Sequence, residues 1–230
     1  MKIIIASHFS RNSNICEYLL QRNPDFKVTL IQEESELNDS RLESLDPDWI
    51  FFPHWSKIIP IGILEKYKCV IFHMTDLPYG RGGSPLQNLI VRGHKTTKLS
   101  AIKCAEELDA GDIYLQRELS LQGTAEEIYS RASLLMEDMV NEIITKNINP
   151  VRQSGEIVKF KRRNACESNI IDLSDIEPVF DHIRMLDAEG YPRAFITSEH
   201  LHFEFSNADL KSDYEIVAEV RITKKVIKDE

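Results

Sequence analysis

Residues 68–85 read KCVIFHMTDLPYGRGGSP, a short apolar run that ends at His73 and passes directly into a loop rich in glycine and proline. An unbroken apolar run of this length is typical of a strand buried on both faces of a parallel sheet. In open α/β sheets, ligands bind beyond the carboxyl ends of such strands. The pattern therefore predicts a functional site that begins at His73.

Other strand-length segments lie on both sides of this run and alternate with helical patterns. Further strands are predicted at residues 2–7, 27–32, 49–53, 98–104 and 112–120. Ile15 and Leu19 recur at helical spacing after the first strand, and a loop with a short helix precedes residue 68. This alternation predicts an α/β fold with a Rossmann-like, mostly parallel sheet.

The domain organisation follows from a helix and a change of pattern after it. Thr124 and Glu127 form a capping box, and the helix that they start is predicted to close a first domain, residues 1–150. Residues 151–230 contain short strands and one helix at 175–186, which predicts a small α+β subdomain. Such a tail can shape a substrate cleft or make a homodimer, and both readings stay open.

Composition excludes several classes of protein. The chain has 230 residues, 42% of them hydrophobic, and no apolar run long enough to cross a membrane. It lacks the pattern of a signal peptide, and its four cysteines are widely separated, so we expect a cytoplasmic protein with reduced thiols and no metal. A net charge of −9 argues against nucleic acid as a partner.

One basic run departs from this acidic composition. Residues 159–163 read KFKRR. Such a run is either a solvated strand edge or a local contact to a phosphate or nucleotide.

Two loop motifs carry residues suited to catalysis. Gly80, Gly82 and Gly83 follow His73 and allow the backbone to approach a ligand closely. Residues 106–114 read EELDAGDIY and place Asp109 in a turn between two predicted strands. A D-x-G turn is also ordinary turn chemistry, so this motif alone does not define a site.

Taken together, these stretches resemble a known family. HMTDLPYGRGGSP at 73–85, TTKLSA at 96–101 and ELDAGDIYLQ at 107–116 resemble the catalytic core of formyltransferases that use 10-formyltetrahydrofolate. That family includes methionyl-tRNA, glycinamide ribonucleotide and sugar N-formyltransferases. The resemblance covers roughly residues 50–125 and implies the formyltransferase fold, with 10-formyltetrahydrofolate as co-substrate.

The resemblance implies that His73 and Asp109 are catalytic. His73 is expected to act as general base on the attacking amine or as donor to the oxyanion, with Asp109 orienting the ring. The family has an asparagine two residues before this histidine, where this chain has Ile71. Thr75, Asn88 or a backbone N–H are the candidates to replace its contact with the formyl oxygen.

The resemblance also implies two sets of binding residues. The pterin is expected between two loops that contain Trp55, Ile59, Ile61, Glu106 and Leu108. The acceptor side is expected to involve His8, Asn12, Thr75, Arg81, Gly82 and Gly83, with the rest of the loop at 7–14. Trp55 has a competing interpretation as a core residue, and Arg81 as a brace for its loop.

The tail suggests which amine accepts the formyl group. Residues 182–195, HIRMLDAEGYPRAF, resemble the stretch that follows the core in sugar N-formyltransferases, whereas methionyl-tRNA formyltransferases carry a longer, basic C-terminal domain. The resemblance therefore implies a nucleotide-linked amino sugar as acceptor, in surface polysaccharide or nonulosonic acid biosynthesis. The alternatives are another amine, on methionyl-tRNA or glycinamide ribonucleotide, and a noncatalytic folate- or sugar-binding protein.

Overall fold

The computed structural model describes residues 1–9 and 12–225. The chain forms two compact units that alternate along the sequence. The first unit contains residues 1–82, 97–119 and 130–159, and the second contains 83–96, 120–129 and the chain from 160 onward. Each unit thus draws on three stretches, so the domain boundary at residue 150 stays a prediction.

The first unit is built on a mixed sheet. In the described part of the chain this sheet has six strands in the order β2-β1-β3-β4-β6-β7. They are β1 (Lys2–Ala6), β2 (Lys27–Ile31), β3 (Trp49–Phe52), β4 (Cys69–His73), β6 (Thr96–Lys103) and β7 (Ile113–Ser120). The pairs β1-β2, β1-β3 and β3-β4 are parallel and β4-β6 is antiparallel. The predicted Rossmann-like, mostly parallel sheet is confirmed.

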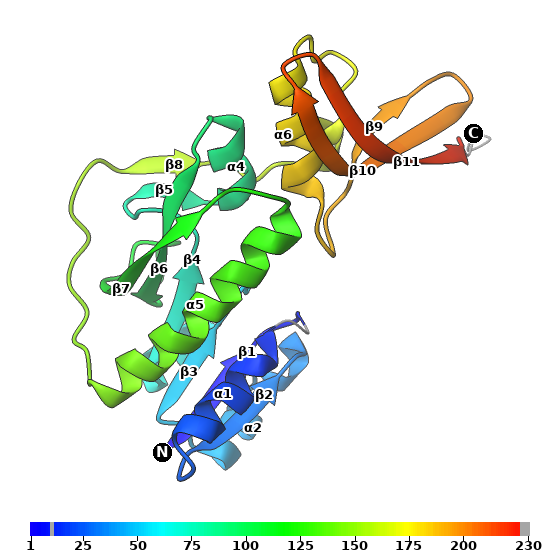
Figure 1. Ribbon diagram of the computed structural model, residues 1–230. Helices are drawn as coiled ribbons and strands as arrows, with labels where there is room; N and C mark the ends of the chain where they lie inside the picture. Colours follow the sequence, from blue (N-terminus) through cyan, green and yellow to red (C-terminus); the bar gives the residue numbers. More distant parts are fainter. Residues whose placement is uncertain (10–11, 226–230) are drawn as a thin grey trace. The chain divides into compact units, whose positions relative to one another are not determined.

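Helices cover both faces of this sheet. Leu42 of α2 (Asp39–Leu45) and Ile63 of α3 (Ile61–Lys66) join Ile4 and Phe52 in one buried cluster. Because side chains alternate along a strand, the neighbouring buried residues point to the opposite face. There α1 (Asn14–Arg22) and α5 (Ala125–Thr145) lie in front of the strands in Figure 1, and Asn23 donates to Asn141 at 2.8 Å.

The short elements β5, α4 and α2 were not predicted, and of these only β5 depends on a partner far away in the sequence. β5 (Tyr79–Gly82) lies inside the glycine-rich loop and becomes a strand by pairing with β8 (Val158–Phe160). α4 (Pro85–Val91) begins directly after it with proline at its start. α2 is capped by Asn38, whose side-chain oxygen accepts from the Arg41 N–H.

The second unit confirms the predicted α+β tail. Its sheet has the order β11-β10-β9 and is antiparallel. The strands are β9 (Ala194–Thr197), β10 (Leu201–Ser212) and β11 (Glu215–Lys224), and α6 (Ile176–Leu186) packs on β10. β10 is longer than the short strands predicted for the tail, because its polar second half is held by pairing with β11.

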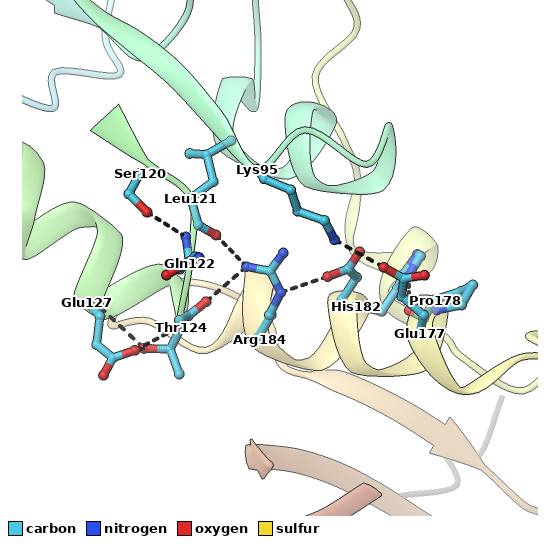
Figure 2. A network of polar contacts seen from close by, with 12 residues as sticks. Lys95, Ser120, Leu121, Gln122, Thr124, Glu127, Glu177, Pro178, His182 and Arg184 are labelled. Atoms are coloured by element: carbon cyan, nitrogen blue, oxygen red, sulfur yellow. Dashed lines mark hydrogen bonds and ion pairs between the residues drawn. The ribbon is translucent and has the colours of Figure 1, made fainter. Parts of the chain in front are cut away.

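Buried polar contacts fix α6 within the second unit (Figure 2). Arg184 Nε donates to Asp181 at 2.7 Å, and its Nη1 donates to the carbonyls of Leu121 and Gly123 at 2.7 and 3.0 Å. The capping box predicted for α5 is present next to them: the Thr124 N–H donates to Glu127, and the Glu127 N–H donates to the Thr124 hydroxyl. Arg184 thus joins α6 to the segment that leads into α5.

Among the described residues, every helix is too short or too polar to span a bilayer. The four cysteines are free thiols. The same residues contain no group of three or more His, Cys, Asp and Glu side chains arranged to hold a metal ion.

Candidate active site

His73 is buried at the carboxyl end of β4 and faces two acceptors. Its Nε2 lies 2.8 Å from the carbonyl oxygen of Gly80, and its Nδ1 lies 3.5 Å from Asp109 Oδ1. A neutral imidazole has one N–H and can donate to only one of them, whereas an imidazolium donates to both. Both ring nitrogens of His73 thus face oxygen acceptors.

Asp109 occupies the turn between β6 and β7 with a left-handed backbone, φ 54°. Its side chain is buried; Oδ1 faces His73, while Oδ2 accepts from the Gly82 N–H at 2.9 Å. Gly111 completes the turn, since a Cβ at that position would lie 1.7 Å from the carbonyl oxygen of Lys103. The D-x-G motif therefore places the carboxylate beside His73, and the structure brings the two predicted catalytic residues together.

Arg81 is buried and bound to a residue that the sequence reasoning missed. Its Nε and Nη2 donate to Gln153 Oε1 at 3.1 and 2.8 Å, and its Nη1 lies 3.8 Å from Glu107. Gln153 lies in an irregular segment after α5 and belongs to no motif, so no local signal could have identified it.

Thr75 is fully buried, and its hydroxyl has no hydrogen-bond partner among the described residues. Its carbonyl oxygen accepts from Ser100 Oγ at 2.7 Å, which fixes the backbone of this segment. Ile71, in the position of the family asparagine, packs against the apolar cluster under the sheet.

Asn88 is another candidate to replace the family asparagine at the formyl oxygen. Its side-chain amide is already occupied by other hydrogen bonds. Its Nδ2 donates to the carbonyls of Gly83, Ser84 and Lys161, and its Oδ1 accepts from Arg92 at 2.8 Å. We therefore assign Asn88 to the packing of the second unit.

The residues predicted at the end of β1 are held by internal contacts. His8 stacks on Trp55 with ring centroids 4.2 Å apart and bonds the Gln32 carbonyl through Nδ1 at 2.6 Å. Asn12 is buried, donates to Ser7 Oγ at 2.7 Å and accepts from Ser133 at 2.8 Å. Two residues of the predicted loop, Ser10 and Arg11, lie outside the described residues.

The two loops predicted to hold the pterin present large apolar side chains to solvent. Leu108 is 66% exposed and Ile61 is 52% exposed. Ile58, which the sequence reasoning did not select, is 92% exposed. Trp55 is buried and Ile59 packs against the buried cluster, whereas Glu106 is exposed. Where exposed apolar side chains lie together they commonly mark a binding surface, and these residues are candidates for one.

The two glycines predicted on the acceptor side have different surroundings. Gly82 has φ 113°, a conformation that favours glycine, and its N–H is bound to Asp109. Gly83 packs against the basic run, because a Cβ there would lie 2.5 Å from the Cβ of Arg162.

Two buried thiols in the first unit are not nucleophiles. Burial raises the pKa of Cys69 to about 12. Burial, with smaller contributions from Cys69 and Asp109, raises the pKa of Cys104 well above its usual value. Because the thiolate is the reactive form, neither cysteine forms a covalent intermediate near neutral pH.

A buried histidine beside a carboxylate, at the carboxyl end of a parallel strand, is the acid–base arrangement that acyl-transfer sites use. Comparison with known proteins defines the family. A protein-family model described as formyl transferase matches residues 9–143. A second family model, described as methionyl-tRNA formyltransferase, C-terminal domain, matches residues 165–223. The chain belongs to the formyl transferase family.

Individual relatives are methionyl-tRNA formyltransferases. The protein of Bacillus mycoides (strain KBAB4) is 33% identical over 176 residues, which are 73% of this chain and 55% of that relative. The protein of Bacillus thuringiensis (strain Al Hakam) is 32% identical over 183 residues, 76% of this chain and 57% of its own length. The chain thus spans a little over half the length of these curated relatives.

Solved structures resemble this chain to different degrees. The methionyl-tRNA formyltransferase from Clostridium thermocellum is 48% identical, with a TM-score of 0.94 over 98% of this chain and 100% of that one. A sugar N-formyltransferase from Shewanella sp FDAARGOS_354 is 15% identical, with a TM-score of 0.69 over 99% of both chains. The second likeness shows the fold alone.

These comparisons correct the expected acceptor and partner. The interpretation as a sugar N-formyltransferase that acts on a nucleotide-linked amino sugar, with no nucleic acid as partner, is wrong, because relatives at 32–48% identity are methionyl-tRNA formyltransferases. The 182–195 stretch misled us because Arg184 within it is buried and supports the packing of the tail. Total charge misled us because it does not describe a local binding face.

Proposed function

We propose that this protein transfers the formyl group of 10-formyltetrahydrofolate to the amino group of methionyl-tRNA. The observation that carries the proposal is the 48% identity with the Clostridium thermocellum methionyl-tRNA formyltransferase over nearly the whole chain. The match of the tail to the C-terminal domain of such enzymes supports it.

In the proposed reaction the amine attacks the formyl carbon and forms a tetrahedral oxyanion. Collapse of this intermediate breaks the bond between the formyl carbon and N10, and tetrahydrofolate leaves with a proton on N10. The amine nitrogen must lose a proton, and we assign His73 as the base that accepts it. Once protonated, the ring donates to both the Gly80 carbonyl and Asp109. The 3.5 Å between His73 and Asp109 is longer than a hydrogen bond, and such contacts commonly tighten when substrate is bound.

Exposed apolar side chains in the first unit fit a folate as ligand. Ile58 and Leu108 expose apolar surface on two loops of the first unit, as a flat heterocycle requires. These loops would bind the pterin, while the formyl group supplies the one-carbon unit that is transferred. His73, supported by Asp109, would take the proton from the attacking amine and return a proton to N10 of the departing tetrahydrofolate.

We assign Thr75 as the residue that donates a hydrogen bond to the formyl oxygen. Ile71 has no polar group, and the Thr75 hydroxyl has no partner among the described residues. Thr75→Val keeps the shape and removes the donor, so we expect kcat to fall by roughly 10²-fold with little change in KM. Thr75→Ser is the matched control and should keep most of the activity. Wild-type kcat in a folded valine variant would disprove this assignment.

The proposed function is tested with initiator tRNA charged with methionine and with 10-formyltetrahydrofolate. Formation of formylmethionyl-tRNA and release of tetrahydrofolate are measured together, with uncharged tRNA, free methionine and glycinamide ribonucleotide as controls. We expect equal amounts of both products and turnover with charged tRNA only. Turnover with another amine in its place, or none with charged tRNA, would overturn the proposal.

A further inference from the structure

The segment between α5 and β8 crosses the first unit as an irregular strap, residues 146–157. It is attached at Val151, which forms two backbone hydrogen bonds of 2.8 Å with Ile113 at the start of β7. Gln153 follows two residues later. The strap is thus fixed close to the turn that carries Asp109.

Both the oxygen and the nitrogen of the Gln153 side-chain amide form hydrogen bonds. Its oxygen accepts two hydrogen bonds from Arg81, at 3.1 and 2.8 Å. Its nitrogen donates to the backbone carbonyls of Asp109 at 2.8 Å and Gly111 at 2.7 Å. One side chain therefore connects the arginine of the glycine-rich loop with both ends of the D-x-G turn.

These bonds bear on the position of the Asp109 carboxylate. Asp109 has a positive φ, which costs free energy for a residue other than glycine. Its carbonyl is held by Gln153 and its carboxylate by the Gly82 N–H, next to Arg81. The turn is therefore fixed from two sides, and Gln153 supplies one of them.

We propose that Gln153 is a positioning residue for the transfer reaction: it holds the Asp109 turn and the Arg81 guanidinium in one arrangement, so that the carboxylate faces His73. The catalytic part of this inference rests on the proposed function. The structural part does not, and the two can be measured separately.

Two substitutions distinguish the hydrogen bonds of the amide oxygen from those of the amide nitrogen. Gln153→Met has a similar length and no hydrogen bonds, whereas Gln153→Glu keeps an acceptor for Arg81 but loses both donors to the turn. We expect both variants to lose roughly tenfold or more in kcat, with KM for 10-formyltetrahydrofolate within about twofold of wild type. Gln21→Met, on the exposed side of α1, is the control and should behave as wild type. Wild-type kcat in either Gln153 variant would overturn the proposal.

A second readout needs no turnover. The Gly82 N–H donates to the Asp109 carboxylate, so its hydrogen exchange, followed by NMR, reports whether the turn is in place. We expect exchange about fivefold faster or more in both Gln153 variants and unchanged in Gln21→Met. If methionyl-tRNA is not a substrate, this exchange still shows whether Gln153 holds the turn. Unchanged exchange would overturn the proposal, as would faster exchange with wild-type kcat.

Discussion

His73→Asn is expected to lower kcat for formyl transfer by about 10³-fold or more, because it removes the group that takes the proton from the attacking amine. Asparagine is smaller than histidine and ends near the position of Nδ1, so its amide can face Asp109, while the hydrogen bond of Nε2 to the Gly80 carbonyl is lost. KM for 10-formyltetrahydrofolate should change little, since the proposed pterin contacts lie on other loops. The measurement is steady-state kinetics with charged initiator tRNA.

Asp109→Asn completes this test. Asparagine tolerates a left-handed backbone and can still accept from the Gly82 N–H, but it has no charge with which to stabilise the imidazolium. We expect kcat to fall by roughly 10²-fold or more. The double variant should be little worse than His73→Asn, because both residues act on one proton. A folded His73→Asn enzyme within tenfold of wild-type kcat would remove His73 from the mechanism.

Arg184→Met is expected to destabilise the protein by about 3–5 kcal/mol, the largest effect on folding that we predict. The substitution leaves Asp181 buried without its ion pair and frees the carbonyls of Leu121 and Gly123 (Figure 2). Urea unfolding followed by circular dichroism measures the change.

The control for this experiment is Arg221→Met. Arg221 lies on exposed β11 and pairs with Glu204 at 3.5 Å, so its loss should cost at most about 1 kcal/mol. Adding Asp181→Leu to Arg184→Met should restore part of the stability, because an unpaired buried charge costs more than an apolar pair. A single variant that loses less than about 1 kcal/mol would show that the contacts of Arg184 do not stabilise α6.

The strands of the main sheet could be predicted from local patterns, and the pair His73 and Asp109 from the resemblance of the stretches around them to the formyltransferase family. The unbroken run that ends at His73 marks a buried strand, and the D-x-G motif marks the turn that carries Asp109. β5 could not be predicted, because a glycine-rich segment becomes a strand only through its pairing with β8. Gln153 was missed for the same reason: its importance lies in contacts with residues far from it in the chain.

The acceptor could not be read correctly from the sequence. The net charge averages over all faces of the molecule, and the tail motif carries side chains that pack its own unit. Ile58 was not selected because the sequence does not tell which isoleucine of an apolar loop faces solvent, and the structure leaves this one almost fully exposed.

The alternation of the two units along the chain limits how the protein can be divided. A fragment that stopped at residue 150 would keep His73 and Asp109 but lose Val151, Gln153 and β8, and with them the support of the Asp109 turn. A fragment long enough to keep that support would still contain residues 83–96 and 120–129, whose packing belongs to the second unit. A single crossover between relatives therefore cannot exchange one unit whole and leave the other intact.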